Sequence, residues 1–298
     1  MSRGTSHSVS GVDGHAGIDD EVVLVGADGM LGRAFAETFA RRGTRWRAAL
    51  YPTLDLTRPS TIAAELGEHA RLVVSCAAWT DVDGAETSED AARAVNATGV
   101  ALLAAHATRI GATLVDFGTD YVFGGDSRTP YPVDAPLAPL GAYGRTKAEG
   151  ERLLAESGAR HLHVRTSWLY APWAKNFVRT IATMSRARPE LRVVDDQRGR
   201  PTSAEHLASA TLALLEGGAT GTWHLTDGGQ CSWFELATEI VRLTGSSCRV
   251  VPCTTAEFPR PAPRPAYSVL DLSASEALLG PMPDWRTNLA RVVARLEP

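Results

Sequence analysis

The stretch that decides the fold is "EVVLVGADGMLGRAFAETFARRG", residues 21–43. Its apolar start predicts a buried strand, and apolar residues at helical spacing farther on predict a helix. Between them, Gly26, Gly29 and Gly32 form G-x-x-G-x-x-G where the strand would turn into the helix. Backbone amides of such a turn, together with the N-terminus of the helix, can hold a pyrophosphate. The stretch therefore indicates a dinucleotide-binding βα unit, and a tight turn without a ligand is the alternative.

The second predicted strand, residues 45–50, bears on the choice of cofactor. Sites that prefer NAD usually have an acidic residue at the end of this strand, where it binds the ribose 2′-hydroxyl. Here residues 48–51 read "AALY" and contain no acid, while Arg33 follows the glycines. This pattern favours NADPH, with NADH possible. An ordinary solvated helix arginine is an equally good interpretation of Arg33.

Strands and helices continue to alternate after this unit. Apolar strands are predicted at 71–78, 112–119 and 161–170, and helices at 89–111 and 142–157, with Thr57 as the N-cap of an earlier helix. Alternation of this kind predicts an α/β fold with a Rossmann-type doubly wound parallel sheet. We assign residues 21–170 to this domain, with a returning helix near 203–216 whose N-cap would be Thr202. Residues 171–298 would form mainly a smaller C-terminal α/β substrate-binding lobe.

Composition excludes several other classes of protein. The chain has 298 residues, 44% of them apolar, and a formal charge of −4, so it lacks the basic excess that nucleic-acid binding requires. No apolar run approaches the roughly 20 residues that span a bilayer. Four cysteines and eight histidines show no metal-binding spacing, so no metal is predicted. The polar residues 1–20, rich in Gly and Ser, suggest a disordered leader, and a cytoplasmic location is expected.

A second chemical signal is the pair Tyr143 and Lys147. At positions i and i+4 of a helix they lie on one face, one turn apart. An adjacent ammonium would favour the phenolate and bring the pKa of the tyrosine down toward working pH, so that it could exchange a proton with a carbonyl or alcohol oxygen. Thr119, at the end of the preceding strand, could hydrogen-bond the same oxygen. A tyrosine packed on an exposed helix is the alternative.

Taken together, these motifs resemble the extended short-chain dehydrogenase/reductase family, and more narrowly its dTDP-4-dehydrorhamnose reductase branch. The matching stretches span residues 22 to about 290 in the family's order. They are "AAWTDVDGAE" (77–86), "VNATGV" (95–100), "GTDYVF" (118–123), "YGRTKAEGE" (143–151), "RTSWLY" (165–170), "NF" (176–177), "DDQRGRPT" (195–202) and "RPAYSVLD" (264–271).

The resemblance implies NAD(P)H-dependent reduction of the C4 ketone of a dTDP-4-keto-6-deoxysugar, as in dTDP-L-rhamnose or related deoxysugar biosynthesis. It implies a catalytic set of Thr119, Tyr143 and Lys147. The implied cofactor site comprises Gly26, Gly29, Met30, Leu31, Gly32, Asp55, Leu56, Ala78, Trp79, Thr80, Tyr143 and Lys147. The implied sugar-nucleotide site comprises Thr80, Val82, Thr119, Asp120, Tyr121, Tyr143, Trp168, Gln197, Thr202 and Arg264.

Some of these residues have other interpretations. Trp168 could be an ordinary core residue, Gln197 and Thr202 could serve loop and capping chemistry, and Arg264 could be solvated. Two departures from the family pattern are Ser75, where the family usually has Asn, and a short segment before "LDLT".

Tyr121 separates reduction from dehydration. The related 4,6-dehydratases are expected to carry Asp-Glu after the threonine, because eliminating water needs a further acid and base. A phenol at this position is unsuited to deprotonating a sugar carbon. A sugar-nucleotide epimerase or dehydratase, and a non-catalytic nucleotide-binding regulatory subunit of the same fold, are the alternative functions. The chain is expected to be a monomer or homodimer.

Overall fold

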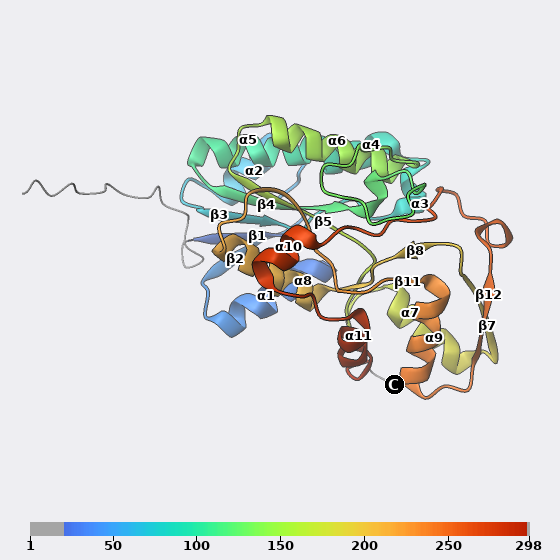
Figure 1. Ribbon diagram of the computed structural model, residues 1–298. Coiled ribbons are helices and arrows are strands. Elements are labelled where there is room, and N and C mark those ends of the chain that lie inside the picture. Colours follow the sequence, from blue (N-terminus) through green and yellow to red (C-terminus); the bar gives the residue numbers. More distant parts are fainter. Residues whose placement is uncertain (1–20, 297–298) are drawn as a thin grey trace, which may run out of the picture.

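A six-stranded parallel sheet forms the centre of the molecule in the computed structural model, which describes residues 21–296 (Figure 1). From edge to edge the strands are β10 (Gly221–His224), β5 (His161–Thr166), β4 (Thr113–Thr119), β3 (Leu72–Ser75), β1 (Val22–Val25) and β2 (Trp46–Ala49). The central strands β1, β3 and β4 are mostly apolar and fully buried, as expected for a sheet covered on both faces. The order of the strands confirms the predicted Rossmann-type fold class.

Helices cover both faces of the sheet (Figure 1). One layer contains α1 (Met30–Arg42), α8 (Ala204–Glu216) and α10 (Ser273–Leu279). The other contains α2 (Pro59–Leu66), α5 (Val100–Ile110) and α6 (Ala142–Glu156). Because α8, α10 and β10 come from the C-terminal half of the chain, that half contributes to the sheet domain as well as to the lobe.

The lobe has its own apolar core. It is built from α7 (Phe177–Ala187), α9 (Trp233–Thr244) and α11 (Trp285–Val293), beside the parallel pair β7 (Glu190–Val194) and β12 (Arg249–Cys253). Two short pairs connect it to the sheet domain: β6 (Leu169–Tyr170) with β9 (Thr202–Ser203), and β8 (Arg198–Gly199) with β11 (Cys231–Ser232). The predicted division at residue 170 stays a prediction, and the predicted leader lies outside the described residues.

The helix predicted at 89–111 is interrupted. It consists of α4 (Glu89–Arg93), a π-helical segment (Ala94–Gly99) and α5, and it follows the short helix α3 (Val82–Ala85). Inside the π-helical segment, the buried Asn96 side chain accepts a hydrogen bond from the Trp79 amide at 2.9 Å and donates to the Trp79 carbonyl at 3.1 Å. The irregular turn therefore places a buried amide side chain where it fixes the loop after β3.

Both predicted N-caps were wrong. Helix α2 begins after Arg58, and the Thr57 hydroxyl instead donates to Asp55 at 2.7 Å. Thr202 lies in β9, one residue before the N-cap position of α8 at Ser203. Thr57 is engaged in a local hydrogen bond and Thr202 in strand pairing, so neither threonine caps its helix.

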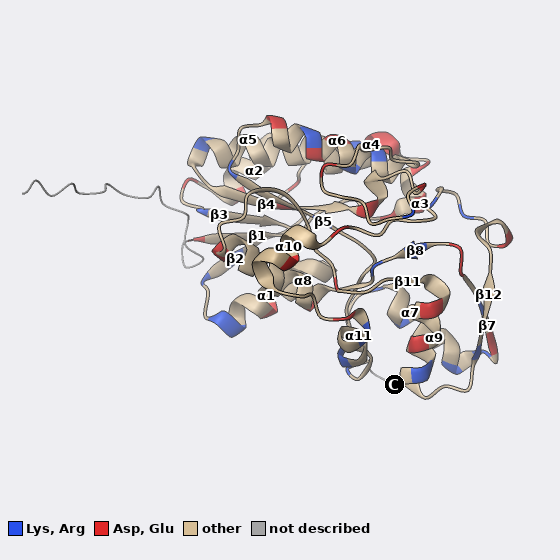
Figure 2. Cartoon of the chain, in the orientation of Figure 1, with Lys and Arg blue, Asp and Glu red and all other residues tan. Residues whose placement is uncertain are grey.

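Charge is distributed over the helices without a single-sign face in the view of Figure 2, where acidic and basic segments both occur along α6 and near α4. Within residues 21–296, no helix has the length and apolar character to span a bilayer.

Gly26 and Gly32, in the turn after β1 and the first turn of α1, are required for different structural reasons. Gly26 has a φ of +73°, which favours glycine, and its carbonyl accepts a hydrogen bond from the Gly29 amide at 3.1 Å. A Cβ on Gly32 would lie 2.0 Å from the Gly26 carbonyl oxygen. Gly32 therefore lets the first turn of α1 pack directly against the turn that precedes it.

We predict that Gly32→Ala lowers the free energy of unfolding by about 1–3 kcal/mol, because the added methyl must push α1 away from the turn. This loss should occur although alanine is the better helix former. Gly124→Ala is the control, since its Cβ would find its nearest atom at 3.4 Å, at ordinary contact distance. Urea unfolding of both variants measures the difference, and equal effects would contradict the packing argument.

Candidate active site

A cavity of about 1190 Å³ lies between the carboxyl ends of the sheet strands and the lobe. It is lined by the turn after β1, the loops after β2 and β3, the end of β4, the start of α6, and by α7 and α9 of the lobe. Ligands of open α/β sheets bind at this edge. The fold thus brings the glycine turn and the Tyr-x-x-x-Lys helix, more than a hundred residues apart in the sequence, to one cavity.

Most of the predicted site residues line this cavity. They are Gly26, Gly29, Met30, Leu31, Asp55, Leu56, Ala78, Trp79, Thr80, Val82, Thr119, Asp120, Tyr121, Tyr143, Lys147 and Trp168. Gly32, Gln197, Thr202 and Arg264 are not among the lining residues. Gly32 packs against Gly26, and Thr202 is fully buried in β9.

Gln197 and Arg264 contact lining residues instead of lining the cavity themselves. Gln197 accepts a hydrogen bond from the Trp233 indole at 3.2 Å and donates to Thr255 at 2.9 Å. Arg264 donates to Asp83 at 2.6 Å, and a hydrogen bond and charge from Arg264 act on the phenol of Tyr121. Each would affect a ligand through its neighbour.

Thr119 ends β4, and its neighbours in the cavity are the phenols of Tyr121 and Tyr143. The Thr119 hydroxyl accepts a hydrogen bond from the Tyr121 amide at 3.2 Å and donates to the Asp120 carboxyl at 3.2 Å. It is also close enough to the Tyr143 phenol to lower the pKa of that group. The two aromatic rings meet edge to face with centroids 6.1 Å apart. Two hydroxyls on different elements therefore converge on one place in the cavity.

The expected lowering of the Tyr143 pKa by Lys147 was wrong for this structure. Burial raises the pKa of Tyr143 to about 12, the nearby Thr119 hydroxyl opposes this rise, and the carboxylates of Asp120 and Asp116 add to it. The phenol is therefore held protonated, which suits a proton donor. Lys147 is buried, and its ammonium acts on Asp116 rather than mainly on the phenol.

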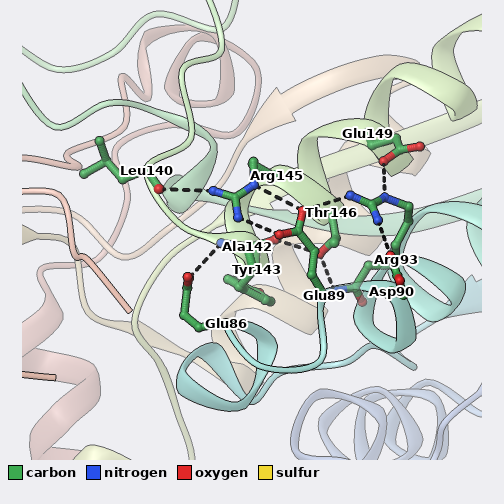
Figure 3. A network of polar contacts seen from close by, with 11 residues as sticks. Glu86, Glu89, Asp90, Arg93, Leu140, Ala142, Tyr143, Arg145, Thr146 and Glu149 are labelled. Carbon is green, nitrogen blue, oxygen red and sulfur yellow. Dashed lines mark hydrogen bonds and ion pairs between the residues drawn. The ribbon is translucent and has the colours of Figure 1, made fainter. Parts of the chain in front are cut away.

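Polar contacts fix the beginning of α6, where Tyr143 lies (Figure 3). Glu86, just after α3, accepts a hydrogen bond from the Ala142 amide at 2.7 Å and so satisfies one of the free donors at the helix N-terminus. Glu89 on α4 binds Arg145 at 2.6 Å and Arg93 at 2.8 Å, and Arg93 also binds Glu149 at 3.0 Å. Helices α3 and α4 thereby hold the turn of α6 that carries the phenol.

The lobe side of the cavity is aromatic. The rings of Trp168 and Trp233 stack with centroids 3.5 Å apart and 9° between their planes, and Phe177 packs against Trp233 at 4.6 Å. Trp168 has a φ of +46°, in the left-handed region that a bulky residue rarely adopts. Such strain clusters at functional sites. The surroundings hold Trp168 in a conformation that presents its ring to the cavity.

Sequence reasoning missed several lining residues, among them Tyr51, Lys175 and Trp233. Lys175 immediately precedes the "NF" motif and is, with Lys147, one of only two lysines in the chain, which was an available signal. Trp233 had no local signal, because it reaches the cavity through the packing of α9. Tyr51 follows the acid-free end of β2 and is 77% exposed.

The residues present fit an NADP-type dinucleotide. Gly26, Gly29, Met30 and Leu31 open the turn and the N-terminus of α1 to the cavity, where a pyrophosphate would be held. The end of β2 has no acidic residue, so no carboxylate there would repel the 2′-phosphate of NADP. Arg33 is not a lining residue: it binds Glu37 at 3.1 Å and lies over the Trp173 ring at 4.5 Å.

Asp120 carries the most unusual carboxyl of the site. Burial raises its pKa to about 7, against hydrogen bonds from Ser268 and Thr119 that oppose the rise. The folded protein therefore keeps a proton on Asp120 that the unfolded chain releases above its ordinary pKa of 3.8. Stability from this group is present below pH 4 and declines as the pH rises toward 7.

We predict that the free energy of unfolding of Asp120→Asn, relative to the wild type, increases between pH 4 and pH 7 by the order of a few kcal/mol and then levels off. The asparagine amide does not ionise, so the variant lacks the loss of stability that ionisation of Asp120 causes between pH 4 and pH 7. Any effect of the substitution that does not depend on pH shifts the whole curve without changing its slope. Asp134→Asn, at an exposed carboxyl, is the control and should give a flat difference. Urea unfolding at a series of pH values tests this, and a flat difference for Asp120→Asn would contradict the raised pKa.

Comparisons with known proteins agree with this geometry. Residues 20–297 match the family model described as RmlD substrate binding domain. A probable dTDP-4,6-dihydroxy-2-methyloxan-3-one 4-ketoreductase of Streptomyces antibioticus is 43% identical, covering 90% of this chain and 92% of that protein. A dTDP-4-dehydrorhamnose reductase of Mycobacterium tuberculosis is 39% identical, with 94% of both chains covered.

Among solved structures, a dTDP-4-dehydrorhamnose reductase of Bacillus anthracis in complex with NADP superposes with a TM-score of 0.89 at 34% identity, covering 93% of this chain and 99% of that one. The family match spans nearly the whole chain, and the sheet order, glycine turn and Tyr-x-x-x-Lys helix are all in place. The chain therefore belongs to the dTDP-4-dehydrorhamnose reductase family of extended short-chain dehydrogenases/reductases.

Proposed function

We propose that this protein reduces the C4 ketone of a dTDP-4-keto-6-deoxysugar with NADPH. The observation that carries the proposal is the convergence of the Thr119 and Tyr143 hydroxyls in the cavity that the glycine turn also lines. Two hydroxyl groups at one point suit a single carbonyl oxygen. The similarity to reductases of dTDP-linked ketosugars supports the same substrate class.

In this proposal each residue has a distinct task. Thr119 and Tyr143 hydrogen-bond the ketone oxygen and orient it, and Tyr143 donates the proton as the oxygen becomes an alcohol. Lys147 offsets the negative charge of Asp116, which raises the pKa of the phenol, and so favours the phenolate left behind. When bound, NADPH supplies the hydride. Thr119 is buried at the end of β4, which would limit the access of water to the proton transfer.

The same residues weigh against the alternative functions. Burial raises the pKa of Tyr121, so this phenol is a poor base for the deprotonation that a dehydratase needs. A non-catalytic regulatory subunit would have no need for the converging hydroxyls and the buried Lys147. We therefore favour a reductase over a dehydratase, an epimerase or a regulatory subunit of this fold.

The sugar nucleotide would extend from the ketone toward the lobe. Thr80, Val82, Asp120, Tyr121 and Trp168 would surround the sugar and the adjoining part of the ligand. Gln197 would support Trp233, and Arg264 would act on Tyr121 beside the diphosphate. A cytoplasmic location and a monomeric or homodimeric state complete the proposal.

The proposed function is tested by mixing the protein with NADPH and a panel of nucleotide-linked 4-ketosugars. Loss of NADPH absorbance and a product reduced at C4 are expected with the dTDP conjugates. Because residues 48–51 contain no acid, kcat/KM should be at least as high with NADPH as with NADH. The free ketosugar should lose rate as well as affinity, since nucleotide binding orients it. Equal reduction of the free sugar, or reduction at another carbon, would overturn the proposal.

We predict that Tyr143→Phe lowers turnover by on the order of 10²- to 10⁴-fold, because the positioned proton donor is lost. The Kd for NADPH, measured by fluorescence titration, should change little. Tyr267→Phe is the control, since Tyr267 is not among the residues that line the cavity. Near-normal turnover by a correctly folded Tyr143→Phe variant would remove Tyr143 from the role of proton donor.

A further inference from the structure

Beneath the catalytic helix, Lys147 belongs to a buried group of four charged side chains, and the proposed mechanism gives no role to Glu151 or His163. Lys147 and Glu151 are one turn apart on α6, so the helical face that carries Tyr143 continues into the interior with a carboxylate. Opposite them, Asp116 of β4 is paired in register with His163 of β5. All four side chains are at least nine-tenths buried.

His163 lies between two carboxylates. Its Nδ1 is 2.9 Å from Asp116 Oδ2, and its Nε2 is 3.3 Å from Glu151 Oε2, an ion-pair distance without good hydrogen-bond alignment. A neutral ring has one N–H and one lone pair. A neutral ring with its proton on Nδ1 could donate to Asp116, but it would leave an unprotonated Nε2 buried 3.3 Å from the Glu151 carboxylate. Only the imidazolium carries a proton on both nitrogens and a positive charge next to both carboxylates.

The surrounding charged groups are compatible with this cation. Glu151 also accepts two hydrogen bonds from Arg165 of β5, whose guanidinium donates to the Val133 carbonyl and to Nε2 of His224 on β10. Burial and the nearby Arg165 lower the pKa of His224 to about 4, so it is a neutral acceptor. The charge of the Lys147 ammonium also acts on Asp116 and lowers its pKa.

We infer that His163 is held as an imidazolium between Asp116 and Glu151, and that this buried chain of charges positions Lys147 and offsets the field of Asp116 at Tyr143. His163 and Asp116 are then positioning residues for the reaction. The directions of the pKa shifts agree. Burial alone would lower the pKa of His163, but the hydrogen bonds and charges of Asp116 and Glu151 raise it above its ordinary value. Burial alone would raise the pKa of Asp116, but Lys147 and His163 lower it.

The consequence for catalysis follows from the charge balance. Asp116 raises the pKa of Tyr143, whereas a positive ring bound to Asp116 weakens that field. Without the imidazolium, the phenol would be a weaker acid and Lys147 would be drawn more strongly to Asp116. This kinetic part of the inference rests on the proposed function, and the protonation state does not.

The protonation state is tested by NMR of ring nitrogens in full-length wild-type protein labelled with ¹⁵N-histidine. One histidine should keep protons on both nitrogens at pH 8, where an ordinary ring is neutral. Glu151→Gln should move the deprotonation of that signal to lower pH by at least about half a unit, because one flanking carboxylate is lost. Glu156→Gln, at an exposed position of α6, is the matched control and should leave it unchanged. A spectrum in which every histidine is neutral at pH 8, or a signal insensitive to Glu151→Gln, would overturn the inference.

The positioning role is tested by His163→Gln, which can donate to Asp116 but carries no charge. We expect kcat to fall by more than about threefold with KM changed less than twofold, and the alkaline limb of the kcat–pH profile to move up by at least about half a unit. His161→Gln on the same strand is the control, since the His161 ring hydrogen-bonds the Ala159 carbonyl at 2.8 Å rather than a carboxylate. A profile that keeps its wild-type limb would assign His163 a purely structural role. If the wild type reduces no ketosugar, the proposed function fails while the NMR result still decides the protonation state.

Discussion

The packing of helix α6 against β4 and β5 is the constraint on which the candidate site depends. Its N-terminus is capped by Glu86 and anchored to α4 through Glu89, while Asn96 donates to Thr146 at 3.2 Å from the π-helical segment. With the helix fixed at these points, a residue every turn faces the sheet. Tyr143 then meets the end of β4, and Lys147 and Glu151 follow it into the interior.

Burying charged side chains on this face of α6 costs electrostatic free energy, and the structure offsets the cost by giving each of these side chains a partner of opposite charge. Arg165 and Glu151 form a doubly hydrogen-bonded pair, and the Asp116 carboxylate is stabilised by its hydrogen bond with His163 and by the charge of Lys147. Removing one member of such a set leaves an uncompensated charge, which is more damaging than the pair was stabilising. Asp120 is treated differently: it has hydroxyl partners rather than a cation, and burial keeps its proton in place up to about pH 7.

The sequence could predict those features of the fold and the site that depend on residues close together in the chain. The glycine turn after β1 and the i,i+4 pair on α6 are local patterns, and both reach the cavity as expected. The indirect roles of Gln197 and Arg264 could not be read in this way, because each depends on a partner far along the chain, Trp233 and Asp83. The pKa of Tyr143 was mispredicted for a related reason. The spacing of Tyr143 and Lys147 was visible in the sequence. The burial that raises the pKa of the phenol was not, because it depends on residues from many parts of the chain that pack around the ring.

The return of α8 to pack beside α1 has a consequence for the order of folding. The apolar face of α1, with Phe35 and Phe39, belongs to the same cluster as Leu207 and Ala208, and Arg42 pairs with Glu216 across 174 residues of sequence. A ribosome releases the N-terminal segment first. The first helix of the nucleotide-binding unit therefore leaves the exit tunnel long before its covering helix exists. During synthesis this aromatic face is exposed to solvent, chaperones or other nascent chains, and its final burial is a late, non-local event.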